Sequence, residues 1–145
     1  MTTRVKIKNG DVFRIQLNEK NYTLGIVLHV SKVFKQSALV GIFDRPLSHS
    51  SEVDPQSLIN TQFYDVPNYT GTQMMKQGEW PILGNFPEML KGREIPLLRA
   101  SYHIYYKDEV IKTLTDPDQL KEYTELQGQG KLYILNKLKH HFEIK

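Results

Sequence analysis

The sequence predicts an α+β fold: a mostly antiparallel β-sheet, or a small and partly open barrel, with short helical insertions and a helical C-terminus. Three observations lead to this prediction. Apolar and polar residues alternate with a period of two over residues 12–17 and again over residues 22–30. A tyrosine-rich stretch over residues 102–114 alternates in the same way. Near the C-terminus, Leu132, Leu135 and Leu138 recur every three residues, which is typical of a helix.

The first hairpin accounts for the start of the sheet. Apolar side chains alternate from Phe13 to Leu17, and a polar turn at residues 18–21 leads into a second alternating strand. Gly25 interrupts this strand, so we expect either a bulge or a close approach to its backbone. Residues 38–43 form a continuous apolar run, as expected of a central strand. We expect a single core made of Phe13, Ile15, Ile26, Leu28, Val40, Ile42 and Trp80.

Short helical insertions are predicted in the middle of the chain. Asp54 and Pro55 combine a capping residue with a proline at the first helical position. That helix must be short, because residues 62–66 again have the pattern of a strand. One or two helical turns over residues 70–76 and a short strand over residues 79–83 should follow.

The last third of the chain predicts a second hairpin and two helices. Residues 102–106 and 109–114 should be strands joined by a tight turn at Lys107-Asp108. Asp116-Pro117 repeats the capping signal of a helix start. The final helix is expected to bury a stripe made of Leu132, Leu135, Leu138 and His141, with Ile134 beside it.

Composition limits the class of protein. A chain of 145 residues without a visible linker or repeat suits one domain, residues 1–145. The absence of cysteine excludes disulfides, thiolate metal sites and cysteine nucleophiles. No stretch approaches the ~18 apolar residues of a membrane span. The N-terminus also lacks the apolar run of a signal peptide, so we expect a cytoplasmic protein without membrane contact.

The charge balance does not favour nucleic acid as a partner. The formal net charge is +3, with 19 basic residues against 16 acidic ones, so most of the charge cancels. A nucleic-acid binder concentrates its basic excess in a patch. The densest basic cluster lies over residues 131–145, where a solvated helix face is the expected interpretation.

The sequence shows no reactive constellation. None of the five histidines has metal-ligand spacing with a second histidine or carboxylate on one helical face. His49 lies among serines but lacks the Gly-x-Ser-x-Gly context of a hydrolase. Gly128 and Gly130 lack the lysine of a phosphate-binding loop and should separate two helices. We therefore predict no catalytic, metal-binding or cofactor-binding residue, no cofactor and no enzymatic activity.

Four motifs occur in a fixed order over residues 6–90. They are Gly10-Asp11-Val12-Phe13-x-Ile15-x-Leu17, Tyr22-x-x-Gly25-x-Val27-Leu28, Val40-Gly41-Ile42-Phe43-Asp44 and Gly78-Glu79-Trp80-Pro81-Ile82-Leu83-Gly84. In this order they resemble the bacterial immunity protein 26 family. The resemblance implies a protein that neutralises the cognate toxin of a polymorphic toxin system by binding it, without catalysis. The C-terminal third departs from this pattern, and its role stays open.

The resemblance also implies where contacts with a toxin would lie. Asp44 ends the third motif and Arg45 follows it, and Glu79 and Trp80 belong to the fourth, so these four are the predicted contact residues. For Trp80, a core anchor is the expected role and a place on the binding surface is the alternative. The toxin's activity and the oligomeric state have no signal in the sequence.

Two other classes of protein remain as alternatives. A small-barrel ribonuclease toxin would need acid–base and basic side chains that converge, and Arg14, His29 and Arg45 are the candidates. A nucleic-acid-binding barrel would instead stack bases on aromatic side chains. Its stacking residues would be Tyr102, Tyr105 and Tyr106, although a half-buried sheet is the more common setting for such a strand.

Overall fold

The structure is a computed structural model that describes residues 6–50 and 52–145. This described part contains two sheets, and neither closes into a barrel. The main sheet consists of β1 (Asp11–Gln16), β2 (Asn21–Val30), β3 (Ser37–Ile42), β4 (Leu47–Ser48), β5 (Asn68–Gly71), β6 (Ile82–Asn85) and β11 (Gly128–Gln129). The strand order is β11-β5-β3-β2-β1-β6, and β4 pairs with the start of β2.

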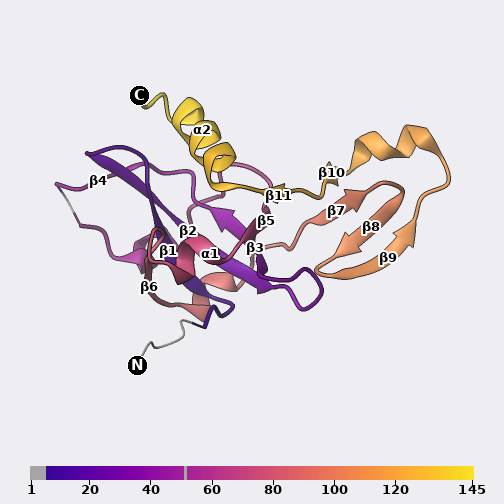
Figure 1. Cartoon of the computed structure of the whole chain (residues 1–145), viewed down its shortest axis with the longest axis horizontal. Coiled ribbons are helices and arrows are strands. Elements are labelled where there is room, and N and C mark those ends of the chain that lie inside the picture. Colours follow the sequence, from indigo (N-terminus) through magenta and orange to yellow (C-terminus); the bar gives the residue numbers. More distant parts are fainter. Residues whose placement is uncertain (1–5, 51) are drawn as a thin grey trace.

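The second sheet lies at one end of the molecule's long axis (Figure 1). Its strands are β7 (Leu97–Ala100), β8 (His103–Tyr106), β9 (Glu109–Thr113) and β10 (Thr124–Glu125), in the order β10-β7-β8-β9. The helical elements are η1 (Pro55–Leu58), α1 (Gln73–Lys76), η2 (Pro87–Leu90), η3 (Pro117–Glu122) and α2 (Lys131–His141). Strand pairs are antiparallel apart from β10–β7 and β11–β5. The predicted α+β class is therefore confirmed.

The first hairpin is confirmed as β1 and β2, whose register sets Phe13 opposite Gly25. The Phe13 ring lies so close to Gly25 that a Cβ atom there would be 2.5 Å from its Cζ atom. Phe13 in turn stacks on Trp80, with ring centroids 5.7 Å apart. Gly25 therefore marks a close approach, whereas the bulge in this strand lies between Val27 and His29.

The prediction of a single core is wrong, because the main sheet is covered on both faces. On one face the sheet packs against α1 and α2, and this cluster includes Phe13, Ile15, Val40, Ile42 and Trp80. On the other face it packs against η1, η2 and β7, and this cluster includes Ile26 and Leu28. The central strand β2 is consequently buried on both sides, which its alternating pattern did not indicate.

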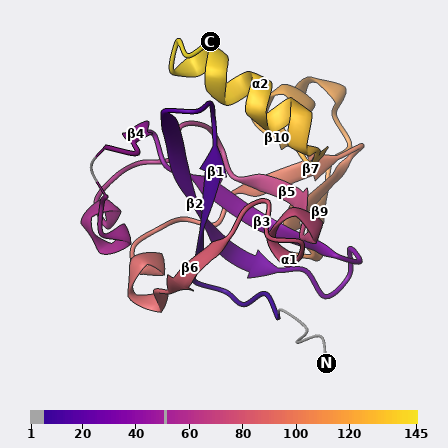
Figure 2. The same cartoon turned by 60° about the vertical axis from the view of Figure 1, so that its left-hand side comes forward.

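Helix α2 runs across one side of the main sheet (Figure 2) and is held there by Ile134 and Leu138, which are both fully buried. The predicted stripe is wrong, because Leu132 is 71% exposed and His141 faces Asp44 at the surface. Residues three apart drift around a helix by about 60° per step, whereas residues four apart stay on one face. None of the helices in the described ranges is long and apolar enough to cross a membrane.

Of two strands predicted in the middle of the chain, one is absent and the other begins later than expected. Residues 62–66 form no strand and contribute only the isolated bridge between Phe43 and Phe63. The strand expected at residues 79–83 begins at Ile82 as β6.

The predicted helix starts and the second hairpin are confirmed. Asp54 and Asp116 cap η1 and η3 by accepting backbone hydrogen bonds. The second hairpin is confirmed as β8 and β9. Gly130 precedes α2 as expected, but Gly128 lies in β11 instead of ending a helix.

Candidate functional site

The corner between β3 and β4 presents two of the predicted contact residues. The Asp44 amide donates to the Gln62 carbonyl at 2.8 Å, and the Thr23 hydroxyl donates to the Arg45 carbonyl at 2.8 Å. These bonds fix the backbone of the corner, so that both side chains project from a rigid base. The Asp44 carboxylate accepts a hydrogen bond from His141 of α2 at 2.7 Å.

The turn between α1 and β6 holds the other two. The carboxylate of Glu79 lies at the surface and forms an ion pair with Lys131. Trp80 is 2% exposed and packs in the core against Phe13. Its side chain is therefore the expected core anchor and is out of reach of a partner. The predicted contact set is reduced to Asp44, Arg45 and Glu79, which stay a prediction.

A row of acidic side chains from the loops beside the main sheet faces α2. Lys137, in the middle of the helix, donates to Asp65. Burial alone would raise the pKa of Asp65, but the hydrogen bonds from Lys137 and the Val66 amide outweigh it and lower the pKa. The complete row consists of the ion pairs Glu79–Lys131, Asp65–Lys137 and Asp44–His141. Both predicted acidic contact residues thus flank the ends of α2.

The candidate ribonuclease residues do not converge. Arg14 pairs with Leu24 in the hairpin register, and Arg45 is held beside Thr23, so both lie near the first half of β2. His29 is five residues beyond Leu24, roughly 17 Å along the strand. These three side chains therefore form no common acid–base site.

The three tyrosines of the second hairpin do not share one face. Tyr105 points toward the β2–β3 connection, where its ring centroid lies 6.1 Å from that of Phe34. Tyr106 is the next residue of β8 and therefore points to the opposite face. Tyr102 lies in the turn before β8. A continuous stacking platform does not form.

A polar cluster around Asp108 joins the two sheets and was missed in the sequence. Its carboxylate accepts hydrogen bonds from His29 Nε2 at 2.8 Å, the Ser31 hydroxyl at 3.0 Å and the Lys32 amide at 2.8 Å. The Tyr69 hydroxyl donates to the same carboxylate at 3.0 Å. The donors are 76 to 79 residues from Asp108, except Tyr69 at 39, so no local pattern indicates the cluster.

The electrostatics of this cluster follow from its hydrogen bonds. Burial alone would raise the pKa of Asp108, but the bonds from Lys32, His29, Ser31 and Tyr69 outweigh it, so the pKa lies below its ordinary value. Burial, followed by the nearby Asp108 carboxylate, raises the pKa of the Tyr69 hydroxyl. Asp108 thus stays ionised and Tyr69 stays protonated near neutral pH, which preserves the donor–acceptor pattern.

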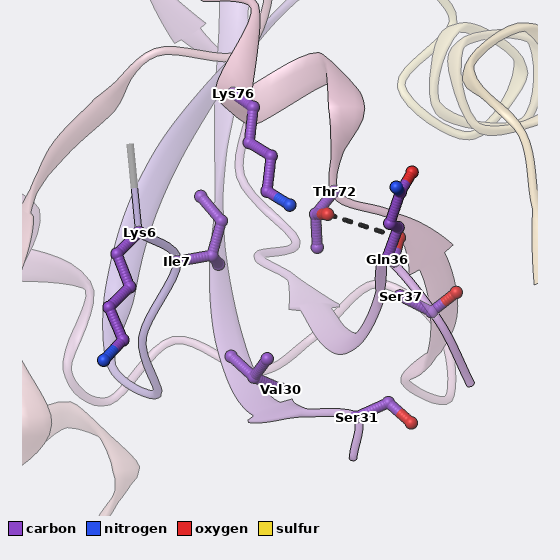
Figure 3. A pocket seen from close by; sticks show the side chains of 8 residues that line it. All are labelled: Lys6, Ile7, Val30, Ser31, Gln36, Ser37, Thr72 and Lys76. Carbon is purple, nitrogen blue, oxygen red and sulfur yellow. Dashed lines mark hydrogen bonds between the residues drawn. The ribbon is translucent and has the colours of Figure 1, made fainter. Parts of the chain in front are cut away.

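Two open hollows lie beside the connection between β2 and β3. The first, of about 530 Å³, lies between the N-terminal segment, the β2–β3 connection and α1 (Figure 3), and there the Thr72 hydroxyl donates to the Gln36 carbonyl. Its two lysines, Lys6 and Lys76, approach from different segments (Figure 3). The second, of about 360 Å³, lies beside the Asp108 cluster and is lined by His29, Lys32, Val33, Tyr106, Lys107, Asp108 and Glu109.

The described part of the chain is therefore a β-rich fold whose main sheet is covered on both faces, with charged side chains and open hollows at its surface. The family model described as Immunity protein 26 matches residues 8–109. The chain therefore belongs to the immunity protein 26 family, as its motifs suggested. Searches of curated proteins and of solved structures gave no match. The matched part ends at Glu109, the first residue of β9, so the rest of β9 and the whole of α2 lie beyond it.

Proposed function

We propose that this protein neutralises a cognate bacterial toxin by binding it directly, without catalysis. Family membership is the observation that carries the proposal, because the family is described as one of immunity proteins. In this proposal the partner is the toxin of a polymorphic toxin system, and the two proteins meet in the cytoplasm. The distance along β2 between His29 and the pair Arg14 and Arg45 argues against the ribonuclease alternative.

Asp44, Arg45 and Glu79, which lie in loops beside the two ends of α2, are the proposed contacts for the toxin. Asp44 and Glu79 are both about half exposed and each pairs with a basic side chain of α2. Exposed ion pairs of this kind are worth only ~0–1 kcal/mol, because water and salt screen them. The two carboxylates can therefore exchange α2 for a basic group of a partner, with Arg45 beside Asp44 adding a charge of the opposite sign.

Charge reversal tests these contacts. The variants Asp44→Lys and Glu79→Lys should slow association with the toxin by about three- to tenfold, because rim charges act mainly on the association rate. Thermal unfolding should stay close to that of the wild type. Glu94→Lys, at another exposed carboxylate, is the matched control. Unchanged association rates for both variants would remove these residues from the interface.

The function itself is tested by co-expression with the toxin domain encoded beside this gene. The chain alone should be harmless, and it should restore the growth of cells that express the toxin. Growth arrest caused by the chain alone, and relieved by Arg14→Ala or His29→Ala, would support a ribonuclease instead. Tight and strongly salt-dependent binding to RNA would favour a nucleic-acid-binding barrel.

A further inference from the structure

Helix α2 covers an apolar strip on one face of the main sheet (Figure 2), and the proposed function gives the helix itself no role. Its two buried side chains, Ile134 and Leu138, belong to the same apolar cluster as Ile15 and Ile42 of the sheet. Leu135 is half-buried beside them. The strip is therefore a surface on which a helix is already seated.

Three carboxylates border this strip, and each pairs with a basic side chain of α2. They belong to Asp44, Asp65 and Glu79, and each of these side chains is 46% exposed. Their partners extend from the first residue of the helix, Lys131, to the last, His141. We refer to the strip and its three carboxylates as the α2 site. An apolar strip with an acidic border is complementary to a helix with an apolar stripe and basic flanks.

The attachment of α2 to this site depends on few contacts. Among the described residues, no main-chain hydrogen bond joins the helix to the main sheet. The three ion pairs are exposed, so water and salt screen them. Gly130 leaves the start of the helix without a side-chain cap. Segments with few buried apolar side chains open locally while the rest of a protein stays folded, so α2 is the element that can leave the sheet.

The cover of the opposite face is held differently. There the guanidinium of Arg93 donates at 2.8 to 3.1 Å to four backbone carbonyls around η1 and η2, those of Leu58, Ile59, Thr61 and Met89. It also lies over the rings of Phe43 and Phe63, 4.9 and 4.8 Å from their centroids. The main chain of that cover is thus tied down, whereas α2 is held through side chains.

The family match contains the α2 site but not the helix. The matched residues, 8–109, include the strip and all three carboxylates, whereas α2 begins at Lys131. The pattern that defines the family therefore covers the face and its border. In this chain the face is occupied by a segment from outside that pattern.

We infer that the α2 site is the docking surface for a basic amphipathic helix of the toxin, and that α2 occupies it in the free protein as an internal competitor. The inference rests on the proposed function and deepens it by naming the partner's chemistry and the regulation of its access. Asp44 and Glu79 exchange His141 and Lys131 for basic side chains of the incoming helix. Insertion of an amphipathic helix into an apolar groove is a common mode of recognition. Because α2 has to leave first, the affinity for the toxin is lowered by the small fraction of open chains.

Hydrogen exchange on the full chain tests the displacement of α2. The probe is the purified toxin domain encoded beside this gene. Amides of residues 134–142 should exchange at least about tenfold faster in the complex than in the chain alone, while those of β2 stay protected. The reason is that α2 has 11 residues, and isolated helices shorter than about 12–15 residues are marginal in water. Unchanged or slower exchange in α2 within a formed complex would overturn the inference.

A cross-link tests whether α2 has to leave. The chain has no cysteine, so Asp65→Cys combined with Lys137→Cys creates one pair of thiols, at positions whose native side chains contact each other. Bridging the two thiols with a short bis-maleimide should weaken toxin binding at least about tenfold. The control is the same double variant with each thiol capped separately by N-ethylmaleimide. Equal affinities of the bridged and the capped protein would contradict displacement.

A weaker contact between α2 and the sheet should strengthen toxin binding. Leu138→Ala removes a buried contact on the side of the helix and leaves the α2 site unchanged, so the toxin should bind at least about threefold more tightly. Leu132→Ala, on the exposed side of the same helix, is the matched control and should leave the affinity unchanged. Weaker binding by Leu138→Ala chains that are folded by circular dichroism would mean that α2 supports the interface, against the inference.

The outcomes separate the two proposals. If the chain neither binds the toxin domain nor protects cells from it, the proposed function fails and the inference fails with it. If it does both while α2 stays protected from exchange and the bridged protein binds as well as the capped one, the proposed function stands and displacement fails. A dimer that exchanges α2 between two copies, detected as a mass that grows with concentration, would assign the site to a second copy and overturn the inference too.

Discussion

At the scale of single residues, Asp108 connects the two sheets, although in the sequence it is only a turn residue. In the sequence it is half of a tight turn, and the turn was predicted correctly. Its contacts with His29, Ser31 and Tyr69 could not be predicted, because each of them joins segments far apart in the chain. A buried carboxylate with four donors makes the two sheets one unit at this point.

Removal of this carboxylate should destabilise the fold. The side chain of Asp108 is only 7% exposed. Asp108→Ala leaves several buried donors without an acceptor, so the free energy of unfolding should fall by about 3 kcal/mol. Denaturant unfolding measures the change. Asp118→Ala, at an exposed aspartate of η3, should shift it by less than about 0.5 kcal/mol. Equal effects of the two variants would contradict the role of the cluster.

The same carboxylate should shape the acid limb of stability. The pKa of Asp108 in the folded protein lies below its ordinary value. Its contribution is therefore present above the pKa of the unfolded chain, about 3.9, and is lost as the pH falls through the lower folded pKa. The unfolding free energy of the wild type should drop more steeply than that of Asp108→Asn as the pH falls from about 5 to about 2. Parallel curves would show that Asp108 is not coupled to folding.

At the scale of elements, α2 shows what periodicity can and cannot predict. The leucine spacing correctly predicted a helix after Gly130, and the structure places it at Lys131–His141. It did not predict which face is buried, because Ile134 and Leu138 turn inward while Leu132 points to solvent. The choice of face depends on the row of carboxylates and on the apolar surface of the main sheet, which are contributed by distant segments.

One substitution at two positions of α2 tests this assignment. Leu138→Ala should lower the free energy of unfolding by about 2–5 kcal/mol, because it leaves a cavity against the main sheet. Leu132→Ala should change it by less than about 0.5 kcal/mol, because that side chain is already in water. Both variants keep the helix propensity of the segment high. A larger effect at Leu132 would restore the stripe inferred from the sequence and contradict the structure.

At the scale of the whole molecule, the class of fold and the family were predictable, and the layering was not. The motifs that indicated the family lie in β1, β2, β3 and the segment leading into β6, which are strands of one sheet. That sheet has two covers that come from separate parts of the chain: α1 and α2 on one face, and η1, η2 and β7 on the other. Alternation within a strand does not reveal that both faces of a sheet are packed against other elements. The residues of the two clusters were therefore predicted to form one core. Trp80 is buried because it lies in the cluster on the face that packs against α1 and α2.

The proposed function is that the protein blocks a toxin by occupying it. The most direct test is a titration of the purified toxin domain with the purified chain, with residual toxin activity measured at each ratio. Direct binding predicts a linear loss of activity that is complete at a stoichiometric amount of chain, together with recovery of both proteins unmodified. Loss of toxin activity at far lower amounts of chain, growing with time, would mean that the chain acts catalytically and would contradict the account.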